Sequence, residues 1–250
     1  MSSTVDVSVI VPVFDRVDML RRTLLSLIGQ RTNLAYEIII VLDGSPDDTR
    51  SVVRSIEYES SVPIRKFSFN SPSGTACRGR NLGIIEARGQ YIAFSDSDDI
   101  SADTRLQTSF DAITQLDVGL VAGRVRYTVD PSRRIEIVSG STSECVPLTL
   151  GLLKLVNPVA PSTVMVSRDI LLAHGGFRTS LRYREDHELL LRLAHRGVSM
   201  LMLDEVLADY MLHAGNNELN FLDSDDEWSV RALRDFRLPY RREEWGIATE

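Results

Sequence analysis

The stretch GRNLGIIEARGQYIAFSDSDD, residues 79–99, joins a helix pattern, a buried strand and a run of acids. Residues Cys77 to Ala87 have helical spacing, and we expect Leu82 and Ile85 to face inward. Tyr91 to Phe94 follow as a short apolar strand, and SDSDD comes directly after it. This order indicates one unit of an α/β sheet that carries acidic side chains at the carboxyl end of its strand.

The same alternation precedes this stretch. Val7 to Val13 and Ile38 to Leu42 are apolar, β-branched runs typical of strands buried on both faces. Ile64 to Phe69 is a weaker strand, and helical patterns begin near Val17 and Ser51. We therefore expect a mostly parallel sheet covered by helices on both faces, whose ligands bind beyond the carboxyl ends of the strands. DGSPDDT, which follows the second strand, and SDSDD both fall at those ends.

The second half of the chain is less regular and favours one domain over two. It contains no repeat, low-complexity tract or clear linker. The expected helices are Leu148 to Leu155 and Glu185 to Arg196, after a helix from about Asp103. The expected strands are Val118 to Val129, Arg134 to Val138, Thr163 to Ser167, Met200 to Leu203 and Val206 to Leu212.

Composition excludes several classes of protein. The formal net charge of −7 disfavours a general nucleic-acid binder, which needs a basic face. No apolar run approaches the roughly 20 residues that span a bilayer. Cys77 and Cys145 form neither a metal-type pair nor a disulfide framework, so a reduced cytosol fits best. Peripheral contact with the inner face of the membrane, and homo-oligomerisation, remain open.

The SDSDD segment is a candidate metal site. In an extended backbone Asp96 and Asp98 face the same side, and two carboxylates suit Mg²⁺ or Mn²⁺ while leaving positions for phosphate oxygens. A solvated acidic turn with an aspartate as helix cap is the alternative interpretation.

Two other segments could contact a nucleotide. Asp43 can accept a hydrogen bond from a base N–H, and Gly44 allows close approach of the backbone, although both also suit a simple turn. Arg78, Arg80 and Asn81 begin a helix, a position that favours anions such as a diphosphate but is also common on plain surfaces.

Asp186 is the candidate general base. It shares a helix face with Leu190 and Leu193, so its carboxylate should face the protein or a cleft rather than bulk water. An acid in the first helical turn is also favoured by the helix dipole, and Glu185 is a competing candidate.

His213 precedes a loop able to approach a ligand. The sequence lacks a nucleophile elbow, a Walker phosphate loop and a dinucleotide fingerprint.

Together these segments resemble the family 2 glycosyltransferases, which have the GT-A fold. The resemblance runs from about Val7 to Asn217 through VSVIVPVFDR, EIIIVLDGSPDDT, GRNLGIIEARGQYIAFSDSDD, GGFRTSLRYREDHELLLRLAHRG and YMLHAGNN. It implies a Rossmann-like central sheet with a smaller acceptor-side region. The implied domain covers residues 1–222, with a nucleotide-sugar half to about 117 and an acceptor half from about 118, followed by a charged tail, 223–250, packed on it.

The resemblance also implies roles for single residues. Pro12 and Phe14 would line the nucleotide pocket, and Asp43 would read the base, usually uracil. The remaining implied positions are Arg80 and Asn81 near the nucleotide, Asp96 at the ribose and metal, Asp98 as direct metal ligand, His213 near diphosphate and metal, and Asp186 as the catalytic base.

The implied reaction is metal-dependent, inverting transfer of one sugar from a nucleotide sugar, usually UDP-linked, to a saccharide, lipid-linked or protein acceptor. The metal would be Mn²⁺ or Mg²⁺. Two rival interpretations remain: a nucleotidyltransferase that makes sugar nucleotides, whose usual glycine-rich phosphate loop is absent, and a non-catalytic nucleotide-sugar-binding scaffold.

Overall fold

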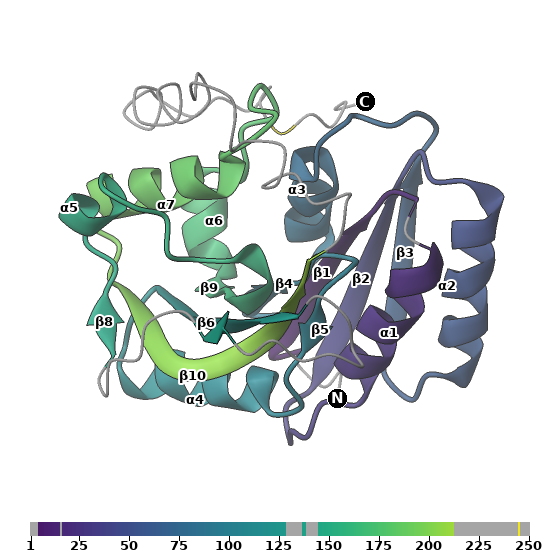
Figure 1. Ribbon diagram of the computed structural model, residues 1–250, viewed down its shortest axis with the longest axis horizontal. Helices are drawn as coiled ribbons and strands as arrows, with labels where there is room; N and C mark the ends of the chain where they lie inside the picture. Colours follow the sequence, from purple (N-terminus) through teal and green to yellow (C-terminus); the bar gives the residue numbers. More distant parts are fainter. Residues whose placement is uncertain (1–4, 16, 129–136, 139–144, 213–244, 246–250) are drawn as a thin grey trace.

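The computed structural model describes residues 5–15, 17–128, 137–138, 145–212 and 245. These residues form one sheet of ten strands with helices on both faces (Figure 1). The elements in chain order are β1 Val7–Val13, α1 Val17–Ile28, β2 Tyr36–Asp43, α2 Asp47–Glu59, β3 Ile64–Phe69, α3 Cys77–Glu86, β4 Tyr91–Phe94, β5 Ile100–Ser101, α4 Arg105–Gln115, β6 Leu120–Thr128, β7 Ile137–Val138, β8 Val146–Pro147, α5 Leu150–Leu153, the 3₁₀ turn η1 Pro161–Thr163, β9 Met165–Ser167, α6 Arg168–His174, α7 Glu185–His195 and β10 Met200–Met211.

The first half of the sheet is parallel, in the order β3-β2-β1-β4. Every residue of β1 is buried, as expected for a strand covered on both faces. The loop before β4 needs a glycine, because a Cβ at Gly89 would lie 2.5 Å from the backbone nitrogen of Ser8. The predicted bounds of β1, β3 and β4 are confirmed, as is the parallel arrangement that brings the ends of β1, β2 and β4 to one edge.

The second half of the sheet is mixed. β9 runs antiparallel to both β4 and β6, while β10 is parallel to β6 and antiparallel to β5 and β8. The prediction of two strands at 200–203 and 206–212 is wrong, because β10 is one strand whose register with β6 shifts around Val206. Gly123 makes room for this irregularity, since a Cβ there would lie 2.4 Å from Leu207.

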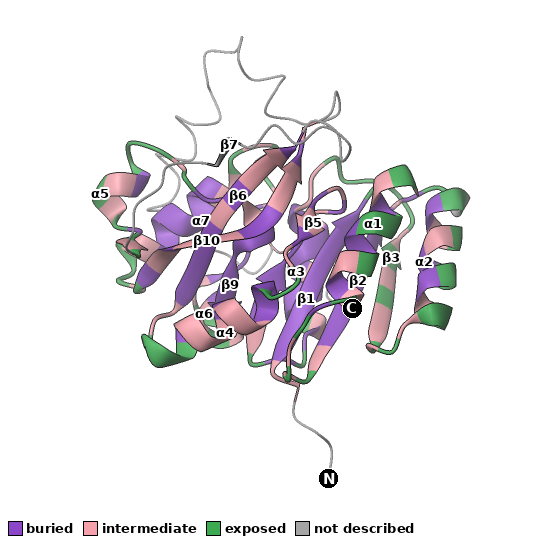
Figure 2. Ribbon diagram, turned by 60° about the horizontal axis from the view of Figure 1, so that its bottom comes forward, coloured by how far each residue is buried: buried purple, intermediate pink, exposed green. Residues whose placement is uncertain are grey.

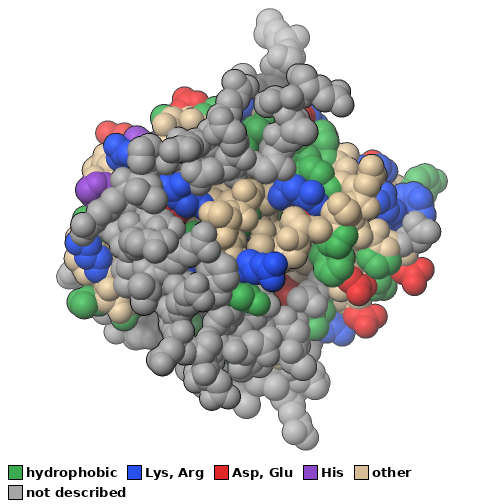
Figure 3. Space-filling view, turned by 90° about the horizontal axis from the view of Figure 1, so that it is seen from above, with side chains coloured by type: hydrophobic (Ala, Val, Ile, Leu, Met, Phe, Trp, Pro, Cys, Tyr) green, Lys and Arg blue, Asp and Glu red, His purple; other side chains and the backbone are tan. Residues whose placement is uncertain are grey.

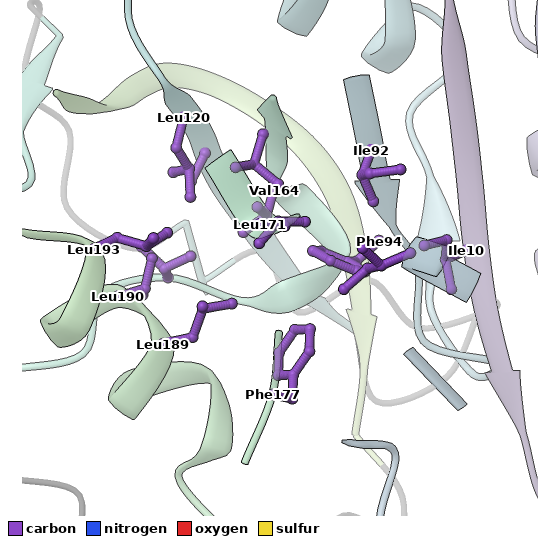
Figure 4. Packing of buried hydrophobic residues seen from close by; sticks show 14 of the residues in the cluster. Ile10, Ile92, Phe94, Leu120, Val164, Leu171, Phe177, Leu189, Leu190 and Leu193 are labelled. Carbon is purple, nitrogen blue, oxygen red and sulfur yellow. The ribbon is translucent and has the colours of Figure 1, made fainter. Parts of the chain in front are cut away.

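Two apolar cores lie on opposite faces of the sheet. Leu20, Leu24 and Leu27 of α1 are fully buried at helical spacing, and with α2 and α4 they cover one face. Helices α3, α5, α6 and α7 cover the other face. Figure 2 shows the buried inner sides of these helices against the buried strands. Figure 4 shows Phe94 of β4 close to Phe177, and their rings meet edge to face with centroids 5.1 Å apart.

Helix α3 presents only part of the expected face to the core, since Leu82 is partly buried and packs against it. Ile85, expected inward, is 41% exposed, whereas Cys77, Arg80, Asn81 and Ile84 are buried. These residues also have helical spacing, but two of them are polar, so apolar periodicity could not identify them. Helix α3 therefore turns an arginine and an asparagine toward the interior of the protein.

Some expected features fall outside the described residues: Val129, residues 134–136, His213 and nearly all of the 223–250 tail. Across the described ranges no helix combines the length and the apolar composition that a bilayer crossing requires. The described part of the chain adds four short elements that the sequence patterns did not indicate, namely β5, β8, η1 and α6.

Candidate active site

The candidate residues gather where β1, β2 and β4 end. Figure 3 views the molecule from this side, with Lys and Arg side chains around the centre of the face and most visible Asp and Glu side chains toward its margins. Acids outnumber bases in the chain as a whole, which has a net charge of −7, so the basic side chains at the centre of this face do not simply reflect composition. The face can offer positive charge to an anionic ligand.

Asp43 ends β2 and is held by two neighbours. Its Oδ2 accepts hydrogen bonds from the backbone N–H and the hydroxyl of Ser73, both at 2.7 Å. Its Oδ1 accepts from the guanidinium of Arg78, with Nε at 3.1 Å, and that guanidinium lies 3.9 Å from the centre of the Phe69 ring. The carboxylate is only 6% exposed, so these donors replace the water it would otherwise bind.

Gly44 allows the segment before α3 to close over Asp43. Its φ is +69°, and a Cβ would lie 2.4 Å from the backbone nitrogen of Pro72. A side chain here would push Pro72 and its neighbour Ser73 away from Asp43. The glycine is therefore required by both backbone conformation and close approach.

Arg80 links two acids that are far apart in the sequence. One terminal nitrogen donates to Oδ1 of Asp96 at 2.6 Å, and the other donates to Oε1 of Glu185 at 2.9 Å. The guanidinium also lies 4.9 Å from the centre of the Phe177 ring. Burial lowers the pKa of Arg80, but the charges of Asp96 and Glu185 more than offset this and raise it. Arg80 therefore stays charged and fixes the acidic loop after β4 against the start of α7.

Asn81 takes part in a buried turn instead of facing the site. It is fully buried, its Oδ1 accepts from the backbone N–H of Phe177 at 2.7 Å, and its Nδ2 donates to the carbonyl of the same residue at 2.8 Å. Nδ2 also lies 3.2 Å from the carbonyl of Trp245. These bonds use the donors and the oxygen of the amide, so Asn81 holds this turn and does not face a ligand.

The turn bonded by Asn81 is held from its other side by buried charges. Glu188, fully buried, accepts from Arg178 at 2.8 Å and from Arg192 at 2.9 Å. Arg192 also donates to the carbonyl oxygens of Gly175 and Gly176, at 3.1 and 2.6 Å. The Gly175-Gly176 turn is thereby fixed to α7, the helix that carries Asp186.

The acidic loop after β4 is fixed by Ser162 and Asp99. The Ser162 hydroxyl accepts from the backbone N–H of Asp96 at 2.9 Å and donates to Oδ2 of Asp99 at 2.5 Å. Oδ1 of Asp99 accepts from the backbone N–H of Met211 at 3.2 Å, which ties the loop to the end of β10. Burial raises the pKa of Asp99 well above its usual range, and the charges of Asp96 and Asp98 raise it further.

Asp98 and Asp96 are the acids of this loop that keep partial exposure. The Asp96 side chain is 26% exposed, and only its Oδ1 is bonded to Arg80. The described residues contain no group of three His, Cys, Asp or Glu side chains arranged to hold a metal ion. Mg²⁺ is commonly held by one or two carboxylates plus substrate phosphates and water, so this donor set fits such a cation without a protein cage.

Asp186 lies in the first turn of α7, where its carboxylate is half-buried. Its Oδ2 accepts from the amide of Asn157 at 2.9 Å. The neighbouring Glu185 is bonded to Arg80, and its side chain is 16% exposed. The residue before them, Arg184, has a φ of +60°, a strained conformation for a non-glycine residue.

Three other residues, Pro12, Phe14 and His213, were expected at the site. Pro12 is buried at the end of β1, where a Cβ on Gly79 would lie 3.1 Å from its side chain, so β1 ends against the start of α3. Phe14 is 49% exposed just beyond β1. His213 lies outside the described residues.

Helix α3 therefore brings three of the candidate segments together. Its arginines, Arg78 and Arg80, reach Asp43, Asp96 and Glu185. The sequence patterns did not indicate that Asn157 contacts Asp186 or that Ser162 holds the acidic loop. They also did not indicate that Arg78 bonds Asp43. An Asn-Pro pair at 157–158 is a turn signal, but nothing in it indicates a contact with Asp186.

Comparisons with known proteins identify the family of this chain. The family described as "Glycosyl transferase family 2" matches residues 8–174. The Escherichia coli enzyme UDP-Glc:alpha-D-GlcNAc-diphosphoundecaprenol beta-1,3-glucosyltransferase WfaP is 28% identical over 217 residues, which cover 86% of this chain and 80% of that protein. Escherichia coli chondroitin synthase is 34% identical over 91 residues, 36% of this chain and 13% of the synthase. Several relatives are thus much longer than the region they share with this chain.

Solved structures share the fold. S. aureus TarS in complex with UDP-GlcNAc has a TM-score of 0.73 at 20% identity, covering 91% of this chain and 65% of that chain. The mannosyltransferase PcManGT from Pyrobaculum calidifontis, in complex with GDP-Man and Mn²⁺, has a TM-score of 0.63 at 16% identity, covering 86% and 59%. The family match covers about two thirds of the chain and includes β1, β2, α3 and the acidic loop after β4, and on this evidence the chain belongs to glycosyl transferase family 2.

Proposed function

We propose that this protein is an inverting glycosyltransferase that moves one sugar from a nucleoside-diphosphate sugar, most simply a UDP-sugar, to an acceptor hydroxyl. The observation that carries the proposal is the Arg80 bridge between Asp96 and Glu185. It holds the acids proposed to bind the donor's metal beside the helix turn that carries Asp186. Donor and base would then meet at one site.

The nucleotide would bind at the end of β2. Each oxygen of Asp43 already accepts two hydrogen bonds, from Ser73 and from Arg78. A base N–H can bond Asp43 only if one of these donors leaves. The Ser73 hydroxyl is the donor most easily replaced, because it has a second partner in the carbonyl of Thr75 at 2.9 Å. The relatives that bind UDP-sugars support a uracil base as the first candidate.

Asp98 and Asp96 would hold Mn²⁺ or Mg²⁺, as their carboxylate chemistry and partial exposure allow. A bound cation would neutralise charge on the departing diphosphate. Arg80 donates to Oδ1 of Asp96 and keeps that oxygen occupied. His213, expected near the metal, stays a prediction from the family resemblance. The Mn²⁺ present in the PcManGT complex supports testing that ion first.

Asp186 would act as the base. It takes the proton of the acceptor hydroxyl, whose oxygen attacks the anomeric carbon while the bond from that carbon to the diphosphate oxygen breaks on the opposite face. An α-linked donor then gives a β-linked product. Glu185 is the poorer candidate, because it is buried and one of its oxygens is bonded to Arg80 at 2.9 Å. Burial raises the pKa of Glu185. The positive charge of Arg80 lowers this pKa, and the negative charge of Asp186 raises it, so that the pKa of Glu185 is raised overall.

The test is a panel of nucleotide sugars screened by thermal shift with and without Mn²⁺, since a bound ligand raises apparent stability. Donors that bind are then assayed for release of nucleoside diphosphate, using saccharide and lipid-linked acceptors, with the acceptor type of WfaP among the first. We expect stabilisation that needs both the metal and a nucleotide sugar. If the protein instead converts a nucleotide sugar and added pyrophosphate into a nucleoside triphosphate and a sugar 1-phosphate, it is a nucleotidyltransferase. Binding without any turnover would favour a scaffold.

A further inference from the structure

Asn157 lies in the loop between α5 and η1, and its side chain contacts the proposed base. Its Nδ2 donates to Oδ2 of Asp186 at 2.9 Å. We propose that Asn157 is a positioning residue that sets the rotation of the Asp186 carboxylate. The inference rests on the proposed function, since it assumes that Asp186 takes the acceptor proton.

The orientation of the Asn157 amide follows from its second bond. Its Oδ1 accepts from the backbone N–H of Val159 at 3.3 Å, a local turn of the kind that asparagine forms readily. An amide oxygen can only accept and an amide NH₂ can only donate. With the oxygen directed to Val159, the NH₂ group is the one left for Asp186, as a carboxylate requires.

The loop that carries Asn157 is anchored on both sides. Before it, a ring nitrogen of His187 lies 2.6 Å from the carbonyl oxygen of Leu153, and both residues are buried. After it, the side chain of Val159 is 6% exposed and belongs to the core. His187 follows Asp186 directly, so the first turn of α7 contacts both this loop and the end of α5 that leads into it. The anchors keep the Asn157 amide at a fixed place relative to the carboxylate.

This contact divides the two oxygens of Asp186 between two tasks. Oδ2 is bonded to Asn157, while Oδ1 has no hydrogen-bond partner within the described part of the chain and is left for the acceptor hydroxyl. The nearby charged groups include Glu185 and Glu188, which are like charges on the same turn, and Arg80, which is bonded to Glu185. Glu188 is itself bonded to Arg178 and Arg192. None of these groups is hydrogen-bonded to Asp186 in the described part of the chain. Asn157 is therefore the described side chain that fixes the direction of the base.

Replacing Asn157 with alanine and with aspartate separates positioning from a purely structural role. Aspartate can still accept from Val159 and so keep the turn, but it puts a negative charge where Asp186 needs a donor. Alanine loses both bonds. We expect Asn157→Ala to lower kcat about tenfold to a hundredfold, the cost of a misplaced catalytic group, with little change in the KM for the donor. Asn157→Asp should melt near wild type and yet be slower than Asn157→Ala at neutral pH.

The matched control is Asn33→Asp, the same change at an exposed position before β2, at the opposite end of the sheet. It should leave kcat and KM unchanged. Wild-type turnover in Asn157→Ala, or an Asn157→Asp enzyme as fast as or faster than Asn157→Ala, would overturn the positioning role. Asp186→Asn distinguishes this failure from that of the proposed function. If Asp186→Asn keeps wild-type transfer, Asp186 is not the base, whatever the Asn157 variants do.

Discussion

Replacement of Arg80 with methionine should cost more stability than most single changes in this protein. The guanidinium is 3% exposed and bonds two carboxylates, of which the Glu185 side chain is 16% and the Asp96 side chain 26% exposed. Removing one partner of a buried ion pair typically costs about 3–5 kcal/mol, because it leaves a charge without compensation. Nε of Arg80 has no hydrogen-bond partner among the described residues, a cost that methionine removes. We therefore expect a loss near the lower end, about 3 kcal/mol.

The assay is equilibrium unfolding in urea, supported by thermal melting. For a chain of this size about 3 kcal/mol corresponds to a drop of roughly 6–12 °C in Tm. The control is a double-mutant cycle with Glu185→Gln, which removes one of the two charges that Arg80→Met leaves unpaired. The double variant should be less destabilised than the sum of the single variants by about 1–3 kcal/mol, the usual coupling between residues in contact.

Two results would refute this reasoning. A loss of under about 1 kcal/mol for Arg80→Met would mean that water reaches both carboxylates and replaces the guanidinium, as at a surface ion pair. Additive effects in the cycle would mean that Arg80 and Glu185 do not interact energetically. Either result would remove the link between the loop after β4 and the start of α7.

Three further predictions concern single positions. Burial raises the pKa of Glu185, so the wild-type protein should lose stability relative to Glu185→Gln as pH rises from about 4.5 through that raised pKa. The Tm of the wild type minus the Tm of Glu185→Gln should therefore fall over this range, and a rise in that difference would contradict the prediction. Burial also raises the pKa of the Cys77 thiol, so a thiol reagent should modify the exposed Cys145 in the native protein and both cysteines only after unfolding; two fast thiols in the native protein would be inconsistent with the packing. Gly83→Ala should destabilise by about 1–3 kcal/mol in urea, because its Cβ would lie 2.4 Å from Ile10 in β1; a neutral change would show that α3 can shift on the sheet.

The parallel half of the fold could be predicted because local sequence patterns identify its strands. β1 and β2 are continuous apolar runs buried on both faces, and acids follow β2 and β4 directly. The rule that ligands bind beyond the carboxyl ends of parallel strands then placed Asp43 and Asp96 on one rim. Local patterns sufficed here since β1 pairs in parallel with β2 along its whole length and with β4 over its first four residues.

The parts that could not be predicted depend on contacts between distant residues. Arg80 and Asn81 are buried because they meet Glu185 and Phe177, about a hundred positions later in the chain, and no local pattern reports such partners. The Asn157 bond to Asp186 is of the same kind, joining a short loop to a helix start. The sequence predicts two strands in place of β10 because Asp204 and Glu205 interrupt the apolar pattern, whereas pairing with β6 continues past them with a shift in register. Such pairings are set by the tertiary fold.

The most direct test of the central claim compares Asp186→Asn and Asp98→Asn in one experiment, with the donor that gives the largest thermal shift and with Mn²⁺. Donor binding is measured by calorimetry and turnover by released nucleoside diphosphate. We predict that Asp186→Asn binds the donor like the wild type but loses at least about a hundredfold in turnover, while Asp98→Asn loses metal-dependent binding. Near-normal turnover in Asp186→Asn, or unchanged metal-dependent binding in Asp98→Asn, would contradict the account.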